Sequence, residues 1–129
     1  MAVALVLAPS ACSLGADEEA KPARGAPAGV AATVDRLERA TAERDFAGIC
    51  DDLLTRAARE RAGGPDCARL LRSAGRGIRR PSIEIRGIEV AGERATVTIR
   101  TAAQGQAPLV DALELRREAG SWRVEALSG

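Results

Sequence analysis

The chain has 129 residues and a formal net charge of +1, so it holds one domain at most and lacks the charge excess of a polyanion-binding protein. It contains no histidine, which removes the commonest general base and the commonest metal ligand. One phenylalanine, one tryptophan and no tyrosine leave no aromatic set for stacking on bases, and the core has to be aliphatic. We therefore expect no nucleic acid partner, no metal and no cofactor.

The first twelve residues form a short apolar segment that ends at Cys12. A membrane-spanning helix needs about 20 apolar residues, and a secretory signal begins with a basic region, which is absent here. The stretch from Ala4 to Cys12 resembles the end of a bacterial lipoprotein signal, although Pro9 replaces the usual branched apolar residue. We expect residues 1–12 to be a truncated lipoprotein signal, with its basic region encoded upstream and the lipid on Cys12. The alternative is an apolar tail with an incidental cysteine.

Residues 13–29 contain few side chains that can pack, so they predict a flexible tether to a domain at residues 30–129. An apolar stripe predicts a first helix over 30–44. Asp45 is expected to cap a second helix, and Thr55 a short continuation of it to Ala62. A third helix carries Cys67, Leu70, Leu71 and Ala74 on one face and should end near Gly75 or Gly77. The apolar face of the second helix consists of Phe46, Ile49, Cys50, Leu53 and Leu54.

After Pro81 the apolar residues alternate with a period of two, which predicts strands. Ile83 and Ile85 lie in one phase and Ile88 in the other, so we expect a β-bulge at or beside Gly87. Further strands are expected at 95–101, 109–115 and 122–126, with a loop at 104–108. Three helices packed on a curved antiparallel sheet of about four strands define an α+β domain.

Three helices, a bent sheet and the last strand Gly120-Ser121-Trp122-Arg123-Val124 resemble the cone-shaped nuclear transport factor 2 superfamily. Asp45 before a helix, Cys50-Asp51-Asp52-Leu53-Leu54, a second cysteine at Cys67 and Gly92-Glu93-Arg94-Ala95-Thr96-Val97 are similar to small secreted bacterial lipoproteins of that type. The resemblance covers Val30 to Leu127 and implies a pocket between the sheet and the long helix. It implies no activity, because this scaffold hosts enzymes, binding modules and assembly domains alike.

Cys50 and Cys67 lie on apolar faces of predicted helices. One lipid-bearing cysteine at Cys12 plus one disulfide would explain the odd count of three and place the domain outside the cytosol. Such a disulfide would stabilise the domain by about 3 kcal/mol. The alternative is two buried free thiols in a cytosolic core. Two isolated cysteines without histidine fit neither a zinc site nor a catalytic thiol.

Asp111 shares its strand phase with Leu109, Leu113 and Leu115, so it should point toward the pocket of the cone. A half-buried carboxylate there is suited to acid/base work. Enzymes that the fold resembles often pair a pocket aspartate with histidine or tyrosine, and this chain has neither. The other interpretation places Asp111 at the open rim or in an ion pair with an arginine such as Arg100.

Five arginines without an intervening acid surround the end of the third predicted helix, namely Arg69, Arg72, Arg76, Arg79 and Arg80. They predict contact with anionic lipid headgroups or an acidic envelope polymer. The alternative is an ordinary solvated face, since cations near a helix C-terminus also interact favourably with the helix dipole.

The sequence thus indicates a lipid-anchored domain of the cell envelope, outside the cytoplasm, with the membrane as a partner through the anchor. Its predicted role is non-enzymatic, the binding of a small apolar ligand or of another envelope protein. An acid/base enzyme that uses Asp111, and a homodimerisation domain that uses the open sheet face, are the alternatives.

Overall fold

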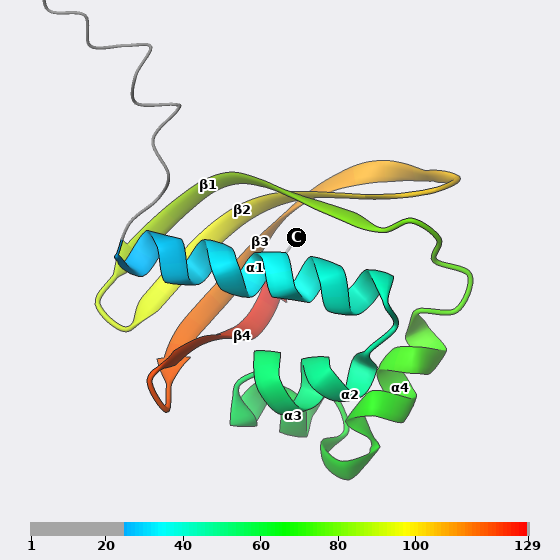
Figure 1. Ribbon diagram of the computed structural model, residues 1–129, viewed down its shortest axis with the longest axis horizontal. Coiled ribbons are helices and arrows are strands. Elements are labelled where there is room, and N and C mark those ends of the chain that lie inside the picture. Colours follow the sequence, from blue (N-terminus) through cyan, green and yellow to red (C-terminus); the bar gives the residue numbers. More distant parts are fainter. Residues whose placement is uncertain (1–24, 129) are drawn as a thin grey trace, which may run out of the picture.

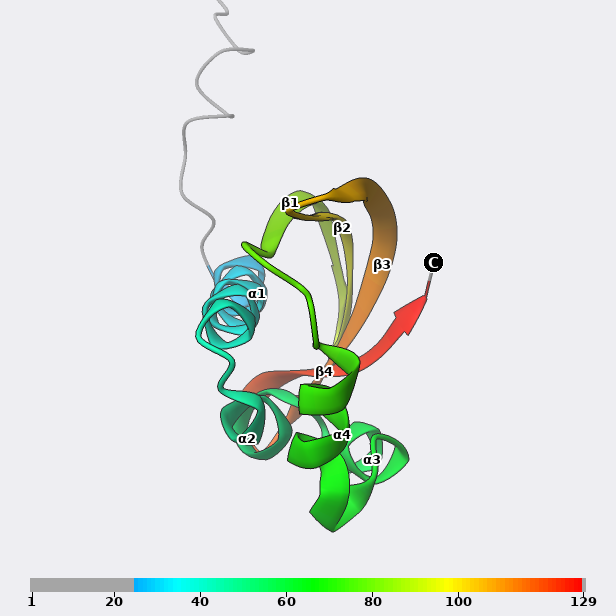
Figure 2. The same ribbon diagram turned by 90° about the vertical axis from the view of Figure 1, so that its right-hand side faces the viewer.

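The computed structural model describes residues 25–128, in which helical segments precede an antiparallel sheet of four strands. The helical segments are α1 (Ala26–Ala42), α2 (Phe46–Gly48), the π-helical η1 (Ile49–Leu53), α3 (Arg56–Arg61), the 3-10 segment η2 (Gly64–Asp66) and α4 (Cys67–Ala74). The strands are β1 (Ser82–Ala91), β2 (Arg94–Ala103), β3 (Gln106–Glu118) and β4 (Ser121–Ser128). Helix α1 lies across one face of the sheet, with α2, α3 and α4 grouped below it (Figure 1). The turned view shows the curvature of the sheet (Figure 2), and the predicted α+β class is confirmed.

Helix α1 begins at Ala26, earlier than the expected start at Val30. Pro27 lies in its first turn, where a backbone N–H has no acceptor within the helix, so a proline there costs no helical hydrogen bond. Gly29 lies against the last strand, since a Cβ at this position would come within 2.9 Å of Cδ1 of Trp122. The domain thus includes residues 26–29, which the sequence assigned to the tether.

The second predicted helix is interrupted in the structure. Asp45 caps it as expected, accepting a backbone N–H at 3.0 Å, and α2 continues directly into η1. Leu54 then adopts an extended backbone and forms a parallel bridge with Val124 of β4. Thr55 caps α3 as predicted, its hydroxyl accepting the backbone N–H of Ala58 at 3.0 Å. The helix is broken because the backbone at this point pairs with the edge of β4 instead.

The four strands form a meander in the order β1-β2-β3-β4. The register of β1 against β2 shifts immediately before Gly87, which confirms the predicted bulge. Strand β3 begins at Gln106 rather than after the expected loop at 104–108, because a tight turn ending in Gly105 joins it to β2. Pairing of β3 with β4 starts only at Ala112. Within the described residues, the stretch of β3 that contains Pro108 therefore pairs with β2 alone. Proline, which has no backbone N–H, is tolerated on such an unpaired edge.

The main core lies on the inner face of the sheet, by which we mean the face that α1 covers. Its buried members are Val30, Val34, Ala95, Val97, Ile99, Leu113, Leu115, Trp122 and Val124. A second buried cluster joins α1 to α2 and η1 through Ala40, Phe46, Ile49 and Leu53. Buried side chains, all aliphatic except that of Trp122, therefore fill the space between α1 and the middle of the sheet, where the resemblance implied a pocket.

Candidate functional site

An apolar hollow of about 200 Å³ lies at the end of the sheet where β1 begins, β2 ends and β3 begins. No charged residue lines it, whereas four other hollows on the described surface each include at least one arginine. Its wall consists of Thr41, Ile78, Pro81, Ser82, Ile83, Thr101, Ala102, Ala103, Gln106, Ala107 and Leu109. A concave, largely apolar wall with a few polar groups is typical of small-molecule sites.

The strand register brings the side chains of this wall together. Ile83 lies directly opposite Thr101, and Thr101 directly opposite Leu109, so the three stand side by side on the inner face. Leu109 is 62% exposed, so an apolar side chain faces solvent at the opening. Ala103 and Ala107 contribute small side chains at the strand ends, and the space they leave forms part of the hollow.

Two hydrogen bonds hold the hollow's wall in place from opposite sides. A carboxylate oxygen of Glu38, on α1, accepts the backbone N–H of Ile83 at 2.5 Å. The backbone N–H of Gln104, in the β2–β3 turn, donates to the carbonyl of Arg79 at 2.8 Å. The start of β1 is thereby fixed to α1, and the segment between α4 and β1 to the turn. The hollow is therefore preformed, which lowers the ordering cost of binding.

Asp111 lies two residues further along β3 than Leu109, opposite Ile99, in the predicted phase. Its side chain is half-buried, and it is not among the residues that line the hollow. Within residues 25–128 no ion pair involves Asp111. Arg100, the partner considered from the sequence, lies 4.0 Å from Glu84 instead. The position fits the interpretation of Asp111 as a carboxylate near the open rim.

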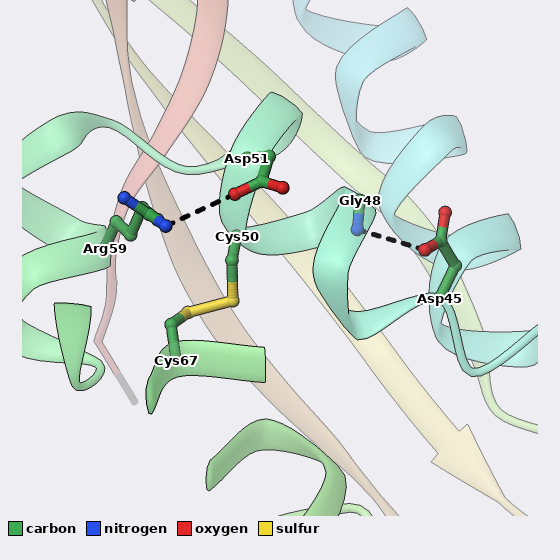
Figure 3. Close-up of a disulfide and its surroundings, with 6 residues drawn as sticks. All are labelled: Asp45, Gly48, Cys50, Asp51, Arg59 and Cys67. Atoms are coloured by element: carbon green, nitrogen blue, oxygen red, sulfur yellow. Dashed lines mark hydrogen bonds and ion pairs between the residues drawn. A yellow bond between two sulfur atoms is a disulfide. The ribbon is translucent and has the colours of Figure 1, made fainter. Parts of the chain in front are cut away.

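A disulfide joins Cys50 of η1 to Cys67 at the start of α4, as predicted (Figure 3). The two Cα atoms are 6.1 Å apart, within the usual range for a disulfide. Both cysteines are buried, with exposed fractions of 3% and 1%. Beside the bond, the guanidinium of Arg59 lies 3.5 Å from a carboxylate oxygen of Asp51. Structural disulfides are typical of proteins that fold outside the reducing cytosol.

All five arginines singled out from the sequence are exposed. Arg69 and Arg72 lie on α4, whereas Arg76, Arg79 and Arg80 lie in the segment that leads to β1. Arg69 forms an ion pair with Asp66 at 3.6 Å, and the other four have no ion-pair partner among the described residues. Their contact with an anionic surface stays a prediction, as do homodimerisation and binding of an envelope protein.

Cys12 and the signal region predicted at residues 1–12 lie outside the described residues. Between residues 25 and 128, no helix combines the length and the apolar character needed to cross a membrane. In the same range, no group of three metal-ligating side chains comes together.

The sequence matches no protein-family model and no curated protein. The structure, however, is similar to the crystal structure of an NTF-2-like protein of unknown function from Silicibacter pomeroyi DSS-3. The similarity has a TM-score of 0.60 at 16% sequence identity and covers 88% of this chain and 96% of the other. At this identity the comparison establishes the fold alone. The chain therefore has the NTF-2-like fold that the residue patterns indicated.

Proposed function

We propose that this protein is a non-enzymatic binding module of the cell envelope, anchored through a lipid on Cys12, that takes up a small apolar ligand. The observation that carries the proposal is the preformed hollow at the open end of the sheet, whose wall contains no charged residue. Burial of apolar surface in such a wall supplies about 25 cal/mol for each Å² of apolar area removed from water.

Two further observations support a binding role over acid/base catalysis. The chain has no histidine or tyrosine that could share proton transfer with Asp111. Asp111 also stands outside the wall of the hollow, so a ligand in the hollow does not have to touch its carboxylate.

The proposed location rests on the disulfide together with the small residues before Cys12. The disulfide favours an oxidising compartment. Ser10 and Ala11 are small enough for a lipoprotein signal peptidase to reach the bond before Cys12.

Filling the hollow is expected to weaken ligand binding. Ala103→Leu places a larger side chain in the wall, so the affinity for 1-octanol, used as an apolar probe, should fall at least about tenfold. Calorimetric titration of the full chain measures the affinity, and amide chemical shifts map the site. Ala91→Leu, an exposed position on β1 at the opposite end of the sheet, is the matched control and should bind as the wild type does. Equal binding by both variants, or shifts elsewhere on the sheet, would rule out the hollow.

The anchor is tested separately from the hollow. Protein isolated from the producing cell is expected to lie in the membrane fraction and to carry acyl groups on Cys12 by intact-mass analysis. Cys12→Ala removes the proposed site of acylation and should therefore move the protein out of the membrane fraction. Ser13→Ala, the neighbouring position, should leave the location unchanged. An unacylated Cys12 in native material would refute the anchor and leave the ligand proposal standing.

A further inference from the structure

The segment between α4 and β1 contributes two residues to the wall of the hollow and carries two positive charges beside that wall. Ile78 and Pro81 belong to the wall, and the two residues between them, Arg79 and Arg80, are exposed. Successive Cα atoms are about 3.8 Å apart, so the backbone of both arginines lies directly beside the wall, and we call this stretch the rim of the hollow. The backbone of Arg79 is fixed by its hydrogen bond from Gln104, so the rim has a defined position.

The positive charges at this rim are not neutralised by the described part of the chain. Neither Arg79 nor Arg80 has an ion-pair partner within residues 25–128. The acidic side chains nearest to them along the chain are engaged elsewhere. Glu84 lies 3.5 Å from Arg86, and Asp66 lies 3.6 Å from Arg69. The carboxylate of Glu38 accepts the backbone N–H of Ile83.

The charge distribution around the hollow gives a bound molecule one favourable orientation. Two positive charges lie beside Ile78 and Pro81, and no charged residue lines the wall itself. An anionic group is therefore attracted to the arginines, whereas an apolar chain is better placed against the uncharged wall.

The volume of the hollow limits the length of that chain. The hollow has a volume of about 200 Å³, which admits a short alkyl chain. Sites for drug-sized ligands are larger, about 300–1,000 Å³.

We infer that the ligand of the hollow is an anionic amphiphile with a short alkyl chain, its tail in the apolar wall and its head group bound by Arg79 and Arg80. This inference rests on the proposed function, because it specifies the ligand of the same hollow. Arginine suits carboxylate and phosphate head groups alike, since its planar guanidinium offers paired N–H donors to either. The shared feature is an anionic head on a short alkyl chain. Free amphiphiles and bilayer phospholipids both offer an anionic head, and the confinement of the hollow favours the free molecule.

The test compares two probes of equal chain length, octanoate and 1-octanol, below the concentration at which octanoate forms micelles. The full chain should bind octanoate about fivefold to tenfold more tightly, the effect of two solvent-exposed charge pairs. Arg79→Gln together with Arg80→Gln should remove this preference and leave the octanol affinity unchanged. The matched control is Arg94→Gln together with Arg116→Gln, which removes the same charge from an opposed pair on β2 and β3. It should keep the preference, whereas raised salt should weaken the preference in the wild type.

The outcomes separate this inference from the proposed function. Octanol binding without any preference for octanoate, or a preference that the Arg79/Arg80 variant retains, would overturn the anionic head group and leave the apolar ligand in place. Failure of both probes to bind would overturn the proposed function itself. Binding to phosphatidylglycerol vesicles without binding to soluble octanoate would assign the arginines to a membrane surface, and the inference would be wrong.

Discussion

Replacing both Cys50 and Cys67 with alanine is expected to lower the free energy of unfolding by about 3 kcal/mol. The bond closes a loop between residues that are 17 positions apart, and this closure restricts the unfolded chain. It also secures α4, whose 8 residues are too few to be stable as an isolated helix. In a domain of this size the change corresponds to a fall in melting temperature of about 10–20 °C.

Urea denaturation of the full chain, followed by the fluorescence of Trp122, measures the loss. Cys12→Ala removes the remaining cysteine and should leave the stability unchanged, so it controls for the loss of a thiol. Reduction of the wild type with dithiothreitol should reproduce the effect of the double variant. An unchanged denaturation midpoint in both cases would mean that packing of the helical segments around Phe46 and Leu53 holds α4 without the bond.

Local patterns were sufficient to predict the elements whose structure depends on nearby residues. The phase change between Ile85 and Ile88 located the bulge, because the apolar residues of a strand can change face only if one residue is added. Asp45 and Thr55 were identified as caps from their side-chain chemistry, and both accept backbone N–H groups in the structure. These features involve residues only a few positions apart, which a single sequence displays.

The features that the sequence did not predict depend on distant residues. Phe46, Ile49, Leu53 and Leu54 continue one helical stripe, yet Leu54 leaves it to pair with Val124, 70 positions away. The extension of β3 back to Gln106 depends on its register against β2, which the proline at 108 concealed. In both cases tertiary pairing prevailed over local propensity.

The candidate site was predicted only in part for the same reason. The phase of Asp111 was predicted correctly, and the resemblance implied a pocket. The position of the hollow at the end of the sheet could not be predicted, because three strand ends and one connecting segment meet there only in the fold. The small side chains at positions 102, 103 and 107 were the available signal. They leave room in the wall where larger aliphatic residues would fill it. The arginines were recognised, although their position at the rim of an apolar hollow was not.

Leu115→Ala is expected to destabilise the domain by about 3–5 kcal/mol, the largest effect of any single change considered. Leu115 is 2% exposed and lies between Ala95 and Val124 in the centre of the inner face. Truncation loses the burial of its side chain and leaves a cavity that the neighbouring strands cannot close. Small domains are stable by about 5–15 kcal/mol, so much of the chain would unfold at moderate urea concentration.

Glu114→Ala is the matched control for this change, because Glu114 is the adjacent residue and points to the opposite, exposed face. Its effect should stay within about 0.5 kcal/mol, and urea denaturation of the two variants gives the comparison. The contrast also tests the site, since Leu109 lies on the same face of β3 as Leu115, in the same uninterrupted register against β2. Equal effects at positions 114 and 115 would mean that β3 is paired one residue out of register. Leu109 would then face away from the hollow, and the wall on which ligand binding depends would lose one of its three paired side chains.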